Sequence, residues 1–265
     1  TGRASSPPPC PLYPRRCARS DVFDPIDGMI PSSRQPQDQS AAAHDRVYRA
    51  LRTSIMYGEL APGEALTLRG IGKQFEVSMT PAREAVRRLV AEGALTLSNS
   101  GRVATPELSS ERLEELAALR ALIEVELASR ALPRAHMALI DRLVAINGTV
   151  ADAVSRRDSV GYIRANLEFH RTLYLRAQAP AMLAMAETVW LQLGPTMRAL
   201  YGRLRRTEPP PFPRLIIAAL RAGGEPGLRL AVRSGGAPGL KMLDRGEGAG
   251  GGAGRGGVTQ RRSAR

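Results

Sequence analysis

The chain has 265 residues and a formal net charge of +13 at pH 7, and this length suffices for two modest domains with cores of their own. Aromatic residues make up only 4% of it, while Ala, Leu and Arg are frequent, which favours helices. The two cysteines lie in a Pro- and Arg-rich segment, so a disulfide-stabilised secreted domain is not indicated. No apolar run approaches the roughly 18 residues of a transmembrane helix, and no signal peptide is recognisable. We therefore expect a cytoplasmic protein with no membrane partner.

The positive charge is unevenly distributed. Residues 66–105 carry a net charge of +3, whereas residues 196–265 carry +10. The tail can add nonspecific attraction to phosphate, but the overall charge does not by itself indicate that a nucleic-acid sequence is read. Residues 1–43 are rich in Pro, Ser, Gln and Arg, and residues 235–265 in Gly, Arg and Ala. We expect both of these terminal segments to be disordered.

A helix is predicted from His44 to Tyr57, with Gly58 ending it. Its apolar stripe consists of Val47, Ala50, Leu51, Ser54 and Ile55, which share one helix face. Arginines flank the stripe at positions 46, 49 and 52. One of them could contact phosphate, and solvated surface arginine is the alternative.

The stretch 66–105 predicts two helices followed by a hairpin. Thr67 can cap a short first helix through its hydroxyl. Thr80 can cap the second helix, Pro81 suits its first position because it lacks an N–H, and Gly93 can end it. The turn between the helices has three or four residues, which is the spacing of a helix-turn-helix.

The second helix has one apolar and one basic face. Its apolar stripe comprises Ala82, Ala85, Val86, Leu89 and Val90, and its open side carries Arg83, Glu84, Arg87 and Arg88. A solvated surface helix with a Glu84–Arg88 pair would show the same pattern. The context of the helix therefore has to decide between the two interpretations.

Two short alternating runs follow Gly93, at residues 94–97 and 102–105, around the turn residues Ser98 to Gly101. Asn, Ser and Gly between such runs predict a β-hairpin. A hairpin directly after the second helix is typical of a wing. Its tip, Ser100, Gly101 and Arg102, could meet backbone phosphate or reach the minor groove.

Two sequences in this region carry a resemblance: YGELAPGE at 57–64 and VSMTPAREA at 77–85. With the helix pair and the hairpin, they make residues 47–105 similar to the DNA-binding domain of the GntR family of bacterial transcription regulators. That family typically has arginine where this chain has Met79. One DNA contact that the resemblance implies is therefore missing, or is replaced by an apolar contact.

The resemblance implies a winged helix-turn-helix over residues 44–106 that binds double-stranded DNA. Thr80 and Arg83 are the first candidates for contacts in the groove. Further candidates are Arg69 and Arg87 for phosphate or base edges and Gly101 and Arg102 at the wing tip.

Residues 107–234 are almost wholly helical in pattern. Long helices are predicted near 110–132, 134–156, 159–178 and 180–205, followed by a Pro-rich linker and short helices near 214–221 and 226–233. Pro195 is expected to kink the fourth helix. Antiparallel helices of this kind bury their stripes only against one another, so we expect a bundle. The fold class is thus mainly α, with a winged helix-turn-helix ahead of an all-helical domain.

The runs LRALIE at 119–124 and NLEFHRTL at 166–173 resemble the effector domain of the FadR-type branch of the family, called FCD, over about residues 109–232. That resemblance implies a divalent metal held by an Asp or Asn, a His four residues later, and two further His. Asn166 and His170 match the first half. No His follows position 170, and Pro213, Gly235 and Gly236 stand where the others are expected. With two donors left, we do not expect tight metal binding, and His170 packed and hydrogen-bonded in the bundle is the alternative.

The bundle could still bind a small anionic metabolite, such as an organic acid. Arg120 and Arg164 are candidates to meet its carboxylate because guanidinium offers two parallel donors, and Asn166 and His170 could complete the site. Either arginine could instead be structural or solvated. The C-terminal end of this domain is atypical, which would weaken ligand binding and dimer contacts there.

The sequence therefore predicts a homodimeric transcription regulator that binds a palindromic operator and responds to a small metabolite. The alternative is a degenerate family member that binds DNA constitutively or serves only as a dimerisation partner. An enzyme is not indicated, because there is no His-Glu-x-x-His run, no phosphate-binding Gly loop and no nucleophile with an evident base.

Overall fold

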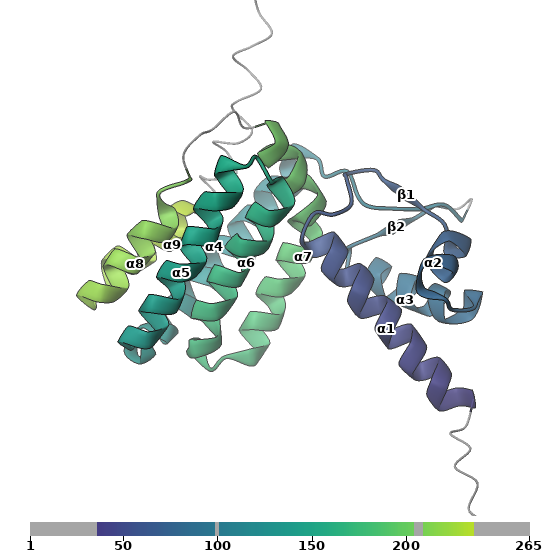
Figure 1. Cartoon of the computed structure of the whole chain (residues 1–265), viewed down its shortest axis with the longest axis horizontal. Helices are drawn as coiled ribbons and strands as arrows, with labels where there is room; N and C mark the ends of the chain where they lie inside the picture. The colour runs from purple at the N-terminus through teal and green to yellow at the C-terminus, as the bar shows by residue number, and fades with distance from the viewer. Residues whose placement is uncertain (1–35, 99–100, 204–208, 236–265) are drawn as a thin grey trace, which may run out of the picture. The chain divides into compact units, whose positions relative to one another are not determined.

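The computed structural model describes residues 36–98, 101–203 and 209–235. The expectations for residues 1–35 with their cysteines, for Ser100 in the wing and for residues 236–265 lie outside this part. The described residues form a winged helix-turn-helix, here called the head (residues 36–105), followed by a helical bundle (residues 110–235), as Figure 1 shows. The predicted fold class is confirmed.

The head contains three helices and a small sheet. Its elements are α1 (Pro36–Met56), β1 (Ala65–Leu66), α2 (Leu68–Phe75), α3 (Met79–Ala91), β2 (Thr96–Leu97) and β3 (Val103–Ala104). β3 lies between β1 and β2 and is antiparallel to both, and Val103 pairs with Leu66 on one side and Leu97 on the other. The sequence predicted the β2–β3 hairpin. It did not reveal β1, which is too short to show an alternating pattern.

Two predicted helix starts are wrong. α3 begins at Met79 with Ser78 as its N-cap residue, rather than with Thr80 as the cap. Pro81 is tolerated within the first turn because the N–H groups there have no helical partner. α1 begins at Pro36 rather than at His44, because proline is accepted at a first helical position and three alanines follow at 41–43.

Other predicted signals are confirmed. The Thr67 hydroxyl accepts a hydrogen bond from the Gly70 N–H at 3.0 Å and caps α2. Gly93 follows α3 with φ of +70°, the left-handed conformation in which glycine is favoured. The head core forms where the apolar face of α3 meets α1. Its buried residues are Val47, Tyr48, Leu51, Ile55, Ile71, Ala82, Ala85, Val86, Leu89, Ala94, Leu95 and Val103, joined by Leu191 from the bundle.

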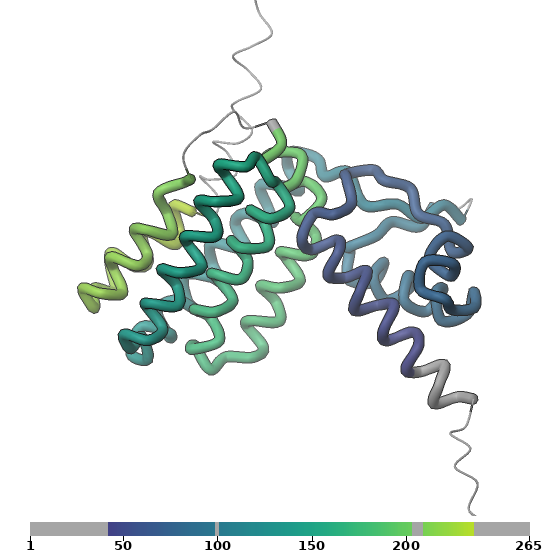
Figure 2. The backbone as a smooth tube through the Cα atoms, in the orientation of Figure 1, coloured from purple at the N-terminus to yellow at the C-terminus, as the bar shows by residue number. Residues whose placement is uncertain are grey.

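The bundle consists of α4 (Ser110–Ala131), α5 (Met137–Ser155), α6 (Ser159–Tyr174), α7 (Pro180–Arg203), α8 (Phe212–Ala222) and α9 (Glu225–Gly235). Short 3-10 turns follow α4 at Leu132–Arg134 and α6 at Leu175–Ala177. α4 packs against α6, α7 and α9, and α5 against α6 and α8, in the arrangement traced in Figure 2. No helix in the described ranges is long and apolar enough to cross a bilayer.

Side-chain caps fix the starts of several bundle helices. Ser109 caps α4 by accepting from the Arg112 N–H at 3.2 Å. The Nδ1 atom of His136 accepts from the Leu139 N–H at the start of α5, and Asp158 caps α6. α7 continues through Pro195 to Arg203. His136 is therefore a structural residue of the α5 terminus.

Candidate nucleic-acid interface and effector domain

The open face of α3 is basic. Ala82, Ala85, Val86 and Leu89 are buried against the rest of the head, whereas Arg83, Glu84 and Arg87 are exposed. Positions three and four residues apart share a helix face, so Thr80, Arg83 and Arg87 point to the same side. Thr80 is exposed as well. The three α3 candidates are thus presented together to solvent.

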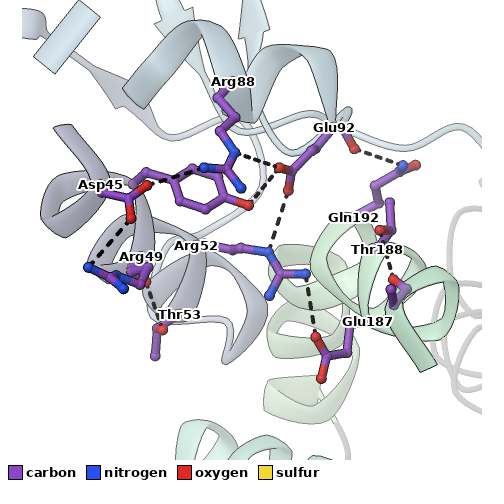
Figure 3. Close-up of polar contacts among 11 residues, drawn as sticks. Asp45, Arg49, Arg52, Thr53, Arg88, Glu92, Glu187, Thr188 and Gln192 are labelled. Atoms are coloured by element: carbon purple, nitrogen blue, oxygen red, sulfur yellow. Dashed lines mark hydrogen bonds and ion pairs between the residues drawn. The ribbon is translucent and has the colours of Figure 1, made fainter. Parts of the chain in front are cut away.

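One group of arginines in the head is engaged by the protein itself. Arg46 donates to the carbonyl oxygen of Phe75 at 3.2 Å, and Arg49 pairs with Asp45. Arg88 is exposed, as its position predicts, but its guanidinium turns back to α1 and pairs with Asp45 at 3.4 Å, a contact drawn in Figure 3. It also lies over the Tyr48 ring, 3.6 Å from the ring centroid. The Glu84–Arg88 pair considered for the solvated alternative does not form, because Asp45 and Glu92 attract Arg88 instead.

A second group is left open. Within residues 36–98 and 101–203, the side chains of Arg69, Lys73, Arg83 and Arg102 make no ion pair and no hydrogen bond, and all four are exposed. Arg87 pairs only with Glu84, at 2.9 Å, with both side chains at least half exposed. Such a surface pair is weak. The open group lies on α2, α3 and the wing, which are the elements that a winged helix-turn-helix turns toward DNA.

The wing requires glycine at one position. Gly101 has φ of +80°, and no atom lies within 4 Å of where a Cβ would be, so the backbone angle and not crowding selects glycine. Ser98 closes the turn by accepting from the Gly101 N–H at 2.9 Å and donating to the Arg102 carbonyl oxygen at 2.9 Å, both through the backbone. Arg102 is held exposed directly beyond this turn.

The YGELAPGE sequence is structural. Thr105, which is 1% exposed, donates from its hydroxyl to the Ala61 carbonyl oxygen at 2.5 Å and accepts from the Glu64 N–H at 3.0 Å. The Glu64 carboxylate accepts from the Ala61 N–H at 2.7 Å. These bonds tie the loop after α1 to the end of β3. Sequence reasoning missed Thr105 because its partners lie more than forty residues away.

The bundle encloses a buried polar cluster, the polar core, made of Arg120, Glu124, His170, Tyr174 and Trp190. The Glu124 carboxylate, 1% exposed, accepts from the Arg120 Nε at 2.7 Å, from the Trp190 Nε1 at 2.6 Å and from the Tyr174 hydroxyl at 3.2 Å. His170 shares a hydrogen bond between its Nδ1 and the same hydroxyl at 3.1 Å. No buried side-chain nitrogen or oxygen in the described part lacks a partner.

Burial and pairing set the charges in the polar core. Burial alone would raise the pKa of the Glu124 carboxyl, but the Arg120 guanidinium and the surrounding donors hold that pKa below its ordinary value. Burial lowers the pKa of His170 to about 4, although the Glu124 carboxylate opposes this. Burial, followed by the nearby Glu124 carboxylate, raises the pKa of Tyr174. At neutral pH the cluster therefore contains one buried ion pair and a neutral imidazole.

The structure does not bring the four effector candidates together. Arg164 is exposed and pairs with Glu59 of the head at 2.9 Å. Asn166 and Arg120 line a cavity of about 20 Å³ with Trp190 and others, which is room for about one water molecule. His170 is not among the residues that line it. Of the two candidate arginines only Arg120 lines this cavity, and Glu124 already neutralises it.

The donor set does not fit the metal that the FCD resemblance implies. His170 offers its Nδ1 to Tyr174, and the Arg120 guanidinium, a cation, stands in the same cluster. Among the described residues no three His, Cys, Asp or Glu side chains are grouped so that they could hold a metal ion. Pro213 and Gly235 have no side-chain donor, so they cannot replace the missing histidines.

Comparison with known proteins agrees with this architecture. Residues 43–103 match the family described as "Bacterial regulatory proteins, gntR family", and residues 115–234 match the "FCD domain". The chain belongs to the GntR family. It is therefore a DNA-binding transcription regulator, and its bundle is an FCD domain, a type of domain associated with metabolite binding.

Relatives of this GntR-family protein match it over most of their own length. The HTH-type transcriptional regulator McbR of Escherichia coli (strain K12) is 27% identical over 187 residues, which are 69% of this chain and 85% of that protein. The gluconate operon transcriptional repressor of Bacillus subtilis (strain 168) is 27% identical over 154 residues, 58% of this chain and 61% of the repressor.

Two solved structures share the fold. E. coli McbR/YncC superposes with a TM-score of 0.67 and 24% identity, covering 77% of this chain and 97% of that one. A putative GntR transcriptional regulator from Rhodococcus sp. RHA1 gives a TM-score of 0.62 and 20% identity, covering 78% and 99%.

Proposed function

We propose that this regulator acts in the cytoplasm as a homodimer that binds a palindromic double-stranded operator, with one recognition helix α3 in each half-site. The observation that carries the proposal is the division of arginines in the head. Those on the α1 side are held by protein carboxylates and carbonyls, whereas Arg69, Arg83 and Arg102 are exposed without a partner in the described structure. Exposed, unpaired guanidinium groups are the donors that base edges and phosphates require.

Each open residue has a proposed role. Thr80 and Arg83, in the first turns of α3, contact base edges in the major groove. Arg69 on α2 and Arg87 on α3 contact phosphate or base edges, and Arg87 first has to leave Glu84. Gly101 and Arg102 meet the backbone or the minor groove at the wing. We propose no catalytic role for the protein.

For the bundle we propose a small organic acid as effector, held by Arg120 and Asn166 beside the existing cavity. Guanidinium and amide groups facing one cavity suit a carboxylate. Because the cavity holds about 20 Å³, such a ligand has to open it and compete with Glu124 for Arg120. His170 would contribute indirectly through Tyr174. Arg164 is less well placed because Glu59 engages it.

The constitutive DNA-binding alternative has an observation in its favour. The polar core satisfies its own donors and acceptors, and the cavity beside it is closed to anything larger than water. A bundle of this kind could serve dimerisation alone. A thermal-stability screen against small mono- and dicarboxylates decides between the two. A rise in Tm that Asn166→Ala abolishes supports the effector, and no rise with any acid supports constitutive binding.

The operator proposal is tested by selecting bound sequences from random duplexes at near-physiological salt, with Arg83→Ala beside the wild type. Enrichment of a palindrome that the variant loses supports the proposal. Binding that shows no enrichment and collapses as salt rises contradicts it, because only nonspecific phosphate attraction then remains.

A further inference from the structure

One turn of α7, residues 190–194, faces both the bundle and the head. Trp190 donates its indole N–H to Glu124 in the polar core at 2.6 Å. The next residue, Leu191, is 0% exposed and completes the apolar core of the head. Successive residues of a helix point in different directions, so this turn joins two cores that otherwise belong to separate domains. A displacement of Trp190 cannot leave Leu191 in place, since both belong to the same helical turn.

Two glycines bring the backbones together beside this turn. A Cβ on Gly194 would overlap the carbonyl oxygen of Ile55 at the end of α1. A Cβ on Gly58 would lie 2.8 Å from the Gly194 carbonyl oxygen, and Gly58 has φ of +68°. The end of α1 therefore lies directly on α7 with no side chain between them. This contact fixes one point of the junction between head and bundle. It does not fix the rotation of α3 about that point, which depends on other residues.

Gln192 supplies a second point. Its Nε2 donates to the Glu92 carbonyl oxygen at 2.9 Å, at the C-terminal end of α3, as Figure 3 shows. Its Oε1 accepts from Arg112 of α4 at 3.0 Å. The same amide nitrogen lies 3.0 Å from where a Cβ on Gly93 would be. Gln192 thus links the end of the recognition helix to two bundle helices.

Glu92 gathers the head side of this junction. Its carboxylate accepts from the Tyr48 hydroxyl at 2.6 Å. It also accepts from the Arg52 Nε at 3.4 Å, and Arg52 pairs with Glu187 of α7 at 3.8 Å, as drawn in Figure 3. The side chain of Glu92 is thereby fixed by the head. Gln192 binds the backbone carbonyl oxygen of Glu92. This oxygen has no partner within the helix, because it lies at the C-terminal end of α3.

We propose that Gln192 is a positioning residue: it holds the C-terminal end of α3 against the 190–194 turn, so that the polar core and the orientation of the recognition helix are coupled. The functional consequence of this coupling rests on the proposed binding to a palindromic operator. In a dimer held by the bundles, the angle of α3 to α7 sets the distance between the two recognition helices, and hence the half-site spacing. Gln192 lies at the end of α3 remote from Thr80 and needs no contact with DNA.

Trp190 is the only tryptophan of the chain and reports on this turn directly. We would titrate the full-length protein with its selected operator duplex and follow Trp190 emission. The wild type should show a change in Trp190 emission on binding. Thr188→Ala is the matched control and should show the same change, because the Thr188 hydroxyl donates only within α7, to the Ala184 carbonyl oxygen. Gln192→Ala, and Gln192→Glu, which keeps an acceptor for Arg112 but loses the donor to Glu92, should bind single half-sites as the wild type does and lose the emission change.

The two Gln192 variants should bind the correctly spaced palindrome about tenfold more weakly than the wild type. They should also tolerate spacers one or two base pairs longer or shorter. An unchanged emission response and an unchanged spacing optimum in Gln192→Ala overturn the proposal. Equal loss on half-sites also overturns it, since that result would show a damaged head rather than altered positioning.

Hydrogen exchange without DNA separates this inference from the operator proposal. Gln192→Ala should raise amide exchange at residues 88–94, at the end of α3, while exchange in α2 stays as in the wild type. If the wild type selects no palindrome, the operator proposal fails, and exchange alone decides the coupling. Unchanged exchange at 88–94 would then overturn it.

Discussion

Arg83 and Arg120 carry the same guanidinium in opposite surroundings. Arg83 stands exposed on α3 without a partner in the described structure, and Arg120 is 5% exposed and bound to Glu124. An exposed, unpaired charge loses little in folding and remains available to an external partner. A buried charge has to be neutralised within the fold, so its removal or that of its partner affects stability first. The head therefore leaves a guanidinium group available to an external partner, whereas the bundle engages its guanidinium group with a carboxylate of its own.

The largest expected effect is on the closed side. Glu124→Gln removes the charge that compensates Arg120 and should lower the free energy of unfolding by about 3–5 kcal/mol, because one buried charge is left unpaired. Urea denaturation followed by Trp190 fluorescence measures this. Glu126→Gln is the matched control: Glu126 lies on the same helix, in an exposed pair with Arg130 at 2.8 Å, and should cost less than about 1 kcal/mol. Equal losses in the two variants would contradict the assignment of a buried pair.

The pH dependence of stability should come next in size. His170 has a folded-state pKa of about 4 against an ordinary value of 6.5, so the unfolded chain takes up its proton first as the pH falls. The free energy of unfolding should be unaffected by His170 above pH 6.5 and should decline between 6.5 and 4, by up to about 3 kcal/mol. The charges that act on the ring are those of Glu124 and Arg120 of α4, and the Tyr174 hydroxyl of α6 lies 3.1 Å from its Nδ1.

His170→Gln keeps a hydrogen-bond donor for the Tyr174 hydroxyl oxygen, whose own proton goes to Glu124, and removes the titration. Its denaturation midpoints should therefore change less than those of the wild type between pH 6.5 and 4.5. Glu124 is present in both proteins, so the difference between their slopes isolates the contribution of His170. The same slope in both proteins would show that the ring is not neutral in the folded bundle.

On the open side, Arg83→Ala should weaken specific operator binding by about 1–3 kcal/mol if the guanidinium contacts guanine, and should leave Tm unchanged. Arg88→Ala, five residues along the same helix, should do the reverse. It removes contacts with Asp45, Glu92 and the Tyr48 ring and should lower Tm more than affinity. Fluorescence anisotropy and thermal unfolding of both variants measure the contrast. Loss of affinity on random DNA equal to that on the operator would make Arg83 a phosphate contact.

Local signals in the sequence were sufficient for most of the fold. The Thr67 cap, the glycine after α3 and the apolar stripes depend on residues within one or two turns, which is the range over which such patterns act. The hairpin followed from its turn residues for the same reason. The start of α3 was misplaced because Ser78, Thr80 and Pro81 all suit a first turn, and only the backbone distinguishes them.

The sites depended on distant partners, and there the sequence was insufficient. The sequence places Arg88 on the open side of its helix with Glu84 as a possible partner, yet its partner Asp45 lies 43 residues away. Glu124 is a single polar position on its helix, and its partners Tyr174 and Trp190 lie 50 and 66 residues further along the chain. Arg120 and Arg164 were paired in the effector prediction, but the fold assigns one to the polar core and the other to Glu59 of the head. Charge complementarity between distant positions has no local periodicity to reveal it.

Met79 sharpens the comparison with the smallest expected effect. It is the first residue of α3 and remains 43% exposed although it is apolar, and Arg83 lies one turn further on the same side. An apolar side chain at this point of a recognition helix suits the methyl group of thymine. We therefore predict that Met79→Ala reduces the preference for thymine at one position of each half-site by about 1 kcal/mol, without change at the other positions.

Deoxyuridine at that position removes only the thymine methyl and supplies the matched control. If Met79 contacts the methyl, replacing Met79 by Ala and replacing thymine by uracil should each weaken binding. The Met79→Ala protein on the uracil duplex should then bind no more weakly than with either change alone. Anisotropy titrations of both proteins on both duplexes complete the cycle. Additive losses would place Met79 away from the base and would leave Thr80 and Arg83, both exposed in the first two turns of α3, as its proposed base contacts.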